Sequence, residues 1–245
     1  MMTFRLFLES GPKRRKTMVH VPELLGCVAV GPTTDDALLA TPDAIRAFRA
    51  FVAARLPGDA AGGDPGDAFE TVVAEHITEG DWLGNGSPYI TLACDLEPVS
   101  EAELETYVGR HRALRAALST WAAGQGSAAL DAKPSAGGRT ARAILLHALG
   151  AGGGYLAAAL GSGPAGYSAL AGAAERGEVE VAEAMRRSAD LIETRLQAIT
   201  EDDRDAIRER SGTTRTLRKA LRRLLEHDWE HLAELSRRPG GPALR

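Results

Sequence analysis

Two histidines, His227 and His231, stand four residues apart in the helical stretch RRLLEHDWEHLAELSRR, residues 222–238. Residues at i and i+4 lie on one helix face with Cβ atoms about 5–6 Å apart, so two imidazoles there can bind one cation. A tightly held metal needs a third ligand. The candidate is His147 in ARAILLHALGAGGGYL, because it lies on another predicted helix and is in phase with Ile144.

The spacing of the pair alone does not settle what it does. Acidic neighbours such as Glu226, Asp228 and Glu230 are ordinary on a solvated helix face, and spacing alone favours that interpretation by about two to one. His147 alone is typical of a hydrogen-bonded core histidine. The metal interpretation gains weight because all three histidines occupy core-facing or core-flanking positions of predicted helices, where bundles build metal sites.

Three further histidines are candidates of a weaker kind. His111 is in phase with the apolar stripe of its own helix and could line the same cavity, although a hydrogen-bonded core histidine is the favoured interpretation. His20 and His76 lie in the strand-rich half and have no partner at metal-ligand spacing. We interpret both as structural.

The elements that must hold these histidines are four helices with single apolar faces. The 3.6-residue period begins at Ser100 and predicts helices over roughly 100–124, 139–160, 179–199 and 216–238. Such faces are most simply buried in a four-helix bundle. The stretch GSGPAGYSALAG after the second helix is interpreted as a flexible loop.

Residues 1–97 show strand periodicity with one helical element. Thr33 and Asp36 cap a helix that Pro42 should kink or restart, because proline lacks an N–H. The predicted strands are TFRLFL, MVHV, CVAV, FETVVAEHI and YITLACDL. The fold class is therefore α+β, with a small α/β domain over 1–97 and an all-α bundle over 98–245.

The composition excludes several classes of protein. A net charge of −4 gives no general attraction to nucleic acid or anionic membrane. The basic run KRRK at 13–16 is about four times more typical of a solvated hairpin tip than of a binding patch. Two cysteines suggest reduced thiols, and we expect no signal peptide and no apolar run near membrane-span length. The expectation is a soluble cytoplasmic protein with no membrane or nucleic-acid partner.

The segment RTARAILLHALGAGGGYL, followed some eighty residues later by TRTLRKALRRLLEHDWEHLAEL, resembles the DinB/YfiT-like family of four-helix bundles over roughly residues 100–238. The resemblance implies that His147, His227 and His231 bind a divalent metal, most often nickel or zinc. It also implies use of a low-molecular-weight thiol as cosubstrate, as in thiol-dependent transferases and isomerases of that kind. Members of the family often form homodimers.

The glycine-rich stretch 150–154 departs from the family pattern. Helix-interior glycines cost up to about 1 kcal/mol each, so we expect a loose turn there, with Gly154 leaving space for a ligand above His147. If the protein is an enzyme, a metal-activated thiol or water attacks a small substrate, in a reaction of transferase, isomerase or hydrolase type. No general base can be named. Arg139, Arg142 and Arg218 are candidates for steering an anionic substrate, with solvated helix charges as the favoured interpretation.

The N-terminal part is similar to the HicB-like antitoxin domain over roughly residues 3–95. The segment VHVPELLGCVAVGPTTDDALLATPDAI carries a strand, a PxLxGC turn, a second strand and a capped helix in that order. This resemblance implies binding of a protein partner. The alternative to an enzyme is therefore a non-catalytic binding or regulatory module with a metal-stabilised bundle.

Overall fold

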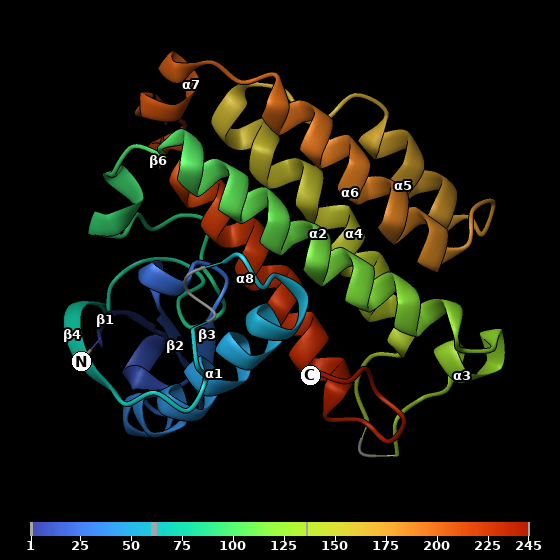
Figure 1. Cartoon of the computed structure of the whole chain (residues 1–245), viewed down its shortest axis with the longest axis horizontal. Helices are drawn as coiled ribbons and strands as arrows, with labels where there is room; N and C mark the ends of the chain where they lie inside the picture. The colour runs from blue at the N-terminus through green and yellow to red at the C-terminus, as the bar shows by residue number, and fades with distance from the viewer. Residues whose placement is uncertain (1, 60–62, 136, 245) are drawn as a thin grey trace.

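A computed structural model describes residues 2–59, 63–135 and 137–244, apart from the side chain of Arg14. A strand-rich part with one long helix lies beside a larger helical part (Figure 1). The predicted fold class is confirmed. The predicted boundary between residues 97 and 98 stays a prediction, because one hydrophobic cluster runs through both parts.

The strand-rich part contains a four-stranded sheet with the order β3-β2-β1-β4. Strands β1 (Met2–Ser10), β2 (Thr17–His20) and β3 (Val28–Gly31) form an antiparallel meander. Strand β4 (Phe69–Ile77) pairs with β1 in parallel and forms an edge of the sheet. Four of the five predicted strands are thus confirmed.

The fifth predicted strand, in the segment 89–96, is wrong. Residues Ala93–Leu96 form the short 3-10 helix η3. The Asp95 carboxylate accepts a hydrogen bond from the N–H of Leu92 at 2.9 Å, and the Asp95 N–H donates to the Leu92 carbonyl at the same distance. This local turn uses the backbone groups that a strand would need for its ladder.

Helix α1 (Thr34–Arg55) is capped as predicted, since the N–H of Asp36 donates to the Thr33 hydroxyl at 3.1 Å. The predicted restart at Pro42 is wrong, and the helix runs through it. Proline removes one N–H from the helix, while the hydroxyl of Thr41 donates to the Ala37 carbonyl. The apolar face of α1 remains buried in the core on both sides of Pro42, which holds the helix in place.

Four long helices form the bundle close to their predicted ends: α2 (Glu101–Ala123), α4 (Ala141–Leu160), α6 (Val181–Gln197) and α8 (Leu217–Ser236). The shorter elements are η1 (Pro12–Arg14), η2 (Pro22–Leu24), α3 (Ser127–Asp131), α5 (Tyr167–Glu175), α7 (Glu201–Asp205), β5 (Arg208–Arg210) and β6 (Thr213–Arg215). The expectation of a flexible loop over 161–172 is wrong, because α5 occupies much of it.

The glycines of α4 explain how α5 fits against the bundle. A Cβ atom on Gly152 would lie 2.5 Å from the Tyr167 hydroxyl, and one on Gly153 would lie 2.7 Å from the Tyr167 ring. Tyr167 donates to the Leu149 carbonyl at 2.8 Å. The glycine stretch is therefore a regular helical turn that admits a close neighbour, and the expected loose turn is wrong. Gly154 does face open space.

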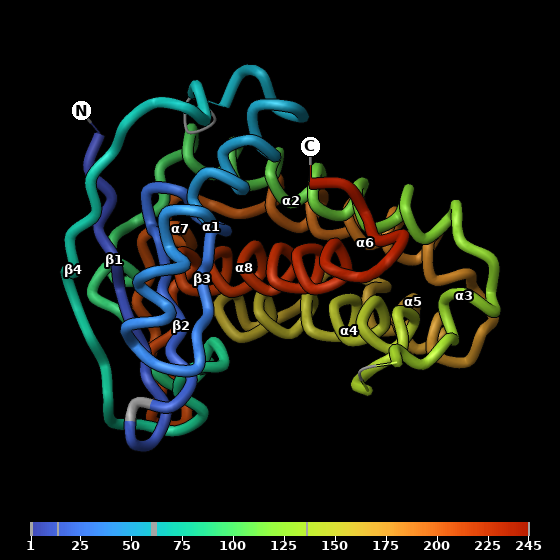
Figure 2. The backbone as a smooth tube through the Cα atoms, turned by 90° about the horizontal axis from the view of Figure 1, so that it is seen from below, coloured from blue at the N-terminus to red at the C-terminus, as the bar shows by residue number. Residues whose placement is uncertain are grey.

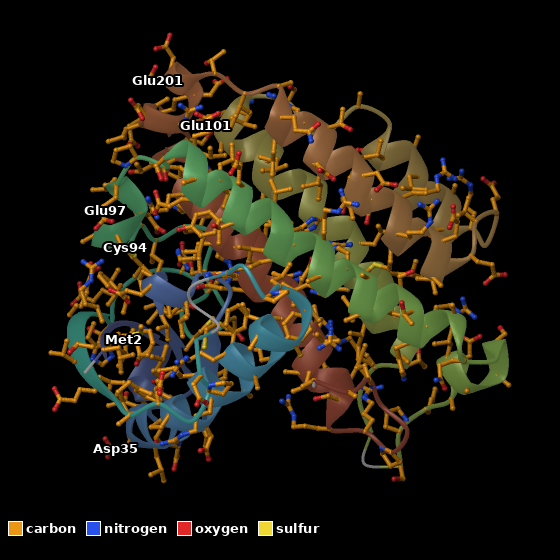
Figure 3. The ribbon with its side chains drawn as sticks, viewed as in Figure 1. Met2, Asp35, Cys94, Glu97, Glu101 and Glu201 are labelled. Atoms are coloured by element: carbon orange, nitrogen blue, oxygen red, sulfur yellow. The ribbon has the colours of Figure 1, made fainter. Side chains whose placement is uncertain are left out.

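Helix α8 lies between the strand-rich part and the other bundle helices (Figure 2). Its Trp229 ring packs edge-on against Phe48 and Phe51 of α1, with centroids 5.0 and 5.4 Å away. Figure 3 shows Cys94 of η3, and Glu97 directly after it, between the sheet and Glu101, where α2 begins. Most of the α8 surface is consequently removed from solvent, including its charged residues.

Helix α4 is long and apolar enough to cross a membrane by length and composition alone. The expectation that no apolar run approaches span length is therefore wrong. In the structure α4 packs against α5, α6 and α8 as a bundle helix, and the described residues contain one such helix and no series of them. The cytoplasmic location stays a prediction.

Candidate metal centre

Three histidines meet where α4 packs against α8. The Nε2 atom of His227 lies 3.2 Å from the Nε2 atom of His147 and 3.2 Å from that of His231. The candidate ligand atoms of all three residues lie within 4.8 Å of one another. Bonds of 2.0–2.1 Å to one tetrahedral ion would separate neighbouring nitrogens by about 3.3 Å. The spacing of the nitrogens therefore fits a divalent metal.

The cluster lies at the edge of the bundle. His227 and His231 are 6% and 4% exposed, whereas His147 is exposed. We expected core-facing or core-flanking positions for all three histidines, and the side chain of His147 is exposed. Its position gives the cluster contact with solvent, which a site that exchanges ligands requires.

The protonation state of the cluster suits metal binding. Burial lowers the pKa of His227 well below its usual value, and the neighbouring His231 and Arg223 lower it further. Burial also lowers the pKa of His147, with a further contribution from His231. Both imidazoles are therefore neutral near pH 7 and present lone pairs, as metal ligands must.

Glu234 orients one of the ligands. The Nδ1 atom of His231 lies 3.1 Å from the Glu234 carboxylate, which also accepts hydrogen bonds from Arg139 at 2.9 Å and Arg238 at 3.3 Å. The hydrogen bond from His231, with help from both arginines, lowers the pKa of Glu234 to about 2. A carboxylate that accepts from Nδ1 leaves Nε2 free to bind an ion. Sequence analysis did not identify Glu234 as a partner of His231. Its position three residues after His231 on the same helix could have indicated the contact.

His227 lacks such a partner. Its Nδ1 atom is buried and makes no hydrogen bond within the part of the chain that the structure describes. Three imidazoles whose Nε2 atoms face one another also cannot all satisfy each other, because each neutral ring has one donor and one acceptor. The cluster is consequently under-satisfied as a purely structural feature.

The bundle interior holds an ion pair. Arg115 of α2 donates to both carboxylate oxygens of Asp228 at 2.6 and 2.9 Å, and to the Ala148 carbonyl of α4 at 3.0 Å. His111 lies 3.5 Å from Asp228, and burial lowers its pKa well below its usual value. The expectation of a solvated Asp228 is wrong. His111 is a buried residue that is not part of the cluster, and its Nε2 atom makes no hydrogen bond to any described residue.

A second buried network joins α8 to the strand-rich part. Glu226 accepts from Arg222 at 3.1 Å and lies 2.9 Å from the Nδ1 atom of His20. Arg222 also donates to both carboxylate oxygens of Asp95. Burial opposes ionisation of Glu226, but His20 and Arg222 lower its pKa to about 2. Glu226 is therefore not solvated, and the interpretation of His20 as structural agrees with its place in this network.

The three candidate steering arginines are all paired with carboxylates. Arg139 binds Glu234, and Arg142 binds Asp131 at 2.8 Å. Arg218 is 6% exposed and binds Glu103 at 2.9 Å, so the interpretation of a solvated charge is wrong for it. His76 lies in β4, where its Nε2 atom is 2.7 Å from the Ser10 hydroxyl, far along the chain from the cluster.

A helical bundle with facing histidines on two of its helices defines a recognisable class of protein. The sequence model of the DinB superfamily matches residues 110–235, just over half of the chain. The chain therefore belongs to the DinB superfamily, which is known for metal binding. No family model matches the HicB-like segment. Searches of curated proteins and of solved structures found no match.

Proposed function

We propose that this protein binds one divalent metal ion, nickel or zinc, through His147, His227 and His231 and is a metal-dependent enzyme. The observation that carries this proposal is the convergence of three Nε2 atoms at 3.2 Å spacings. Membership in the DinB superfamily supports it.

The donor set favours catalysis over a purely structural metal. Three neutral imidazoles leave an ion its full charge and an open coordination position, unlike closed four-ligand sites. A divalent metal bound there would act as a Lewis acid that lowers the pKa of a small thiol or a water. Glu234 holds the ring of His231, and the exposed side of His147 gives the thiol or water its approach.

Metal content measured by elemental mass spectrometry on untagged protein tests the metal. We expect about one ion per chain, lost in a His227→Ala/His231→Ala double variant. A His76→Gln variant is the matched control, because it removes a histidine in β4 and leaves the cluster intact. Absence of metal from the wild type, before and after reconstitution, would refute the proposal.

Cobalt substitution tests the thiol. A small thiol added to the cobalt-loaded protein should produce a sulfur-to-cobalt charge-transfer band, since soft thiolate ligands bind such ions strongly. A loaded protein that shows no band and no change in its visible spectrum with any small thiol would leave water as the activated group.

A second candidate function concerns the strand-rich part, which we propose is HicB-like and binds a protein partner. The order β2, η2, β3 and α1 supports the resemblance. The edge strand β4 exposes Val72 and Val73 by about half, and exposed edge strands pair readily with other chains. A Val72→Lys/Val73→Lys variant should lose such a partner in a pull-down and keep its metal.

A further inference from the structure

A small pocket lies beside the histidine cluster, at the start of α8. Its walls include Tyr155 of α4, Arg215 of β6, the N-cap residue Thr216, and Lys219 and Arg223 of α8. The cavity is about 20 Å³, which is room for one water-sized group. No aspartate or glutamate is among its described lining residues. Its charged lining is therefore entirely cationic.

Two of these cations are almost fully buried. Lys219 is 4% exposed, and its Nζ atom donates to the Thr91 hydroxyl at 3.1 Å and to the Thr214 carbonyl at 3.0 Å, which are both neutral groups. Arg223 is 3% exposed; one of its amino groups donates to Glu226 at 3.0 Å, and its Nε atom makes no hydrogen bond to any described residue. Buried donors of this kind are costly unless an acceptor reaches them.

The neighbouring groups add to the positive potential. The Nε atom of Arg215 is also buried without a partner among the described residues. Thr216 caps α8, a helix of 20 residues, so the positive end of its dipole lies at this pocket. Glu226 is already shared with Arg222 and His20, and it does not line the pocket. The pocket thus has buried cationic donors and no acidic residue among its described lining residues.

Tyr155 connects the pocket to the histidines. Its ring lies 5.8 Å from the His227 ring, and the Arg223 guanidinium lies 5.8 Å from the Tyr155 ring. Lys219, Arg223 and His227 follow one another at four-residue spacing along α8 and share one helix face. A molecule with its charged end in the pocket would thus extend past Tyr155 toward His227.

We infer that this pocket binds the carboxylate end of a small substrate whose reacting end lies at the histidine cluster. The assignment of the substrate rests on the proposed function, whereas binding of a carboxylate in the pocket does not. The pocket has room for one water-sized group, so one carboxylate oxygen enters it and the rest of the substrate lies outside.

Formate, the smallest carboxylate, is the probe, and saturation-transfer NMR on metal-free full-length protein measures its binding. We expect saturable binding that is about tenfold weaker in Lys219→Met, because a charged donor is lost. Lys133→Met, at an exposed position outside the pocket, is the matched control and should bind like the wild type. Circular dichroism checks the fold of each variant.

If Lys219→Met does not fold, Ala158→Leu is the second variant, because Ala158 lines the pocket and a larger side chain there fills it. Equal formate binding in the wild type and in either folded variant would overturn the inference, and so would absence of binding to the wild type. The His227→Ala/His231→Ala variant should bind formate normally. Formate binding without metal binding would refute the proposed function alone, and metal binding without formate binding would refute only the pocket.

Discussion

Helix α8 contributes Asp228 to the bundle interior and His227 to the histidine cluster, and the two side chains differ in how fully their polar atoms are hydrogen-bonded. Asp228 is held by a bidentate arginine, and Arg115 also reaches the Ala148 carbonyl. One residue earlier, His227 has a buried nitrogen without a partner among the described residues and two other imidazoles within hydrogen-bond distance. The paired charges of Asp228 and Arg115 stabilise the fold, and an under-satisfied cluster of good ligands is available for binding. Three substitutions and one pH titration test this contrast between paired and unpaired polar groups.

Breaking the interior pair should have the largest effect. Arg115→Met leaves the fully buried Asp228 carboxylate without its partner, which should lower the free energy of unfolding by about 3–5 kcal/mol. Urea denaturation of the metal-free protein measures the loss. Arg112→Met on the same helix is the control, since its pair with Glu193 is at the surface and such pairs contribute about 0–1 kcal/mol. Equal losses in both variants would contradict the contrast.

Removing a ligand should act mainly through the metal. His227→Ala should change the unfolding free energy of the metal-free protein by no more than about 1–2 kcal/mol, since it breaks no ion pair. Metal at about a hundred times its dissociation constant should stabilise the wild type by about 2.7 kcal/mol and the variant by almost nothing. Thermal melts with and without metal separate the two effects, and a variant that still gains stability from metal would refute the role of His227.

Loosening the orientation of a ligand should cost less. Glu234→Gln removes the carboxylate that accepts from His231, and metal affinity should fall by about 10–100-fold. Competition with a chromophoric chelator measures the affinity. Glu230→Gln, on the same helix, is the control and should leave the affinity unchanged. An unaltered affinity in Glu234→Gln would show that His231 needs no orienting partner.

The smallest effect concerns the pocket and its pH dependence. Burial lowers the pKa of Lys219 to about 8, so the side chain is charged below that pH and neutral above it. Formate binding should therefore be present below pH 8 and decline as the pH rises through it, as NMR titration can follow. The charged groups that act on Lys219 are Asp95, Arg222, Arg215 and Glu209. A formate affinity that stays the same from pH 6 to about pH 10 would contradict this assignment.

The sequence predicted the bundle helices well because their apolar stripes are local and regular. Leu217, Leu221 and Leu224 repeat with the helical period. Thr216 caps the start of α8, and the helix ends at Ser236, two residues before the predicted end. The spacing of His227 and His231 likewise follows from helix geometry alone. The meeting of His147 with this pair agrees with the packing of two predicted helices in one bundle.

The burial of the α8 charges could not be predicted in this way. A periodic pattern shows which face of a helix is apolar, but it does not show that the strand-rich part, with α1 and η3, covers another face. Arg222 is satisfied by Asp95, 127 residues away, and Glu226 by His20, 206 residues away. No local pattern connects such residues. The predicted strand in 89–96 failed for a different, local reason, because the hydrogen bond from the Leu92 N–H to the Asp95 carboxylate outweighed the strand propensity of the segment.

The 206-residue separation of His20 and Glu226 also sets an order of events during translation. The strand-rich part leaves the ribosome first, with Phe48 and Phe51 lacking their cover of Trp229 until α8 is made. Neither the junction between the two parts nor the histidine cluster can form until α8 has been synthesised. A nascent chain therefore completes the cover of α1 and the proposed metal site together, and a chain without α8 lacks two of the three candidate ligands.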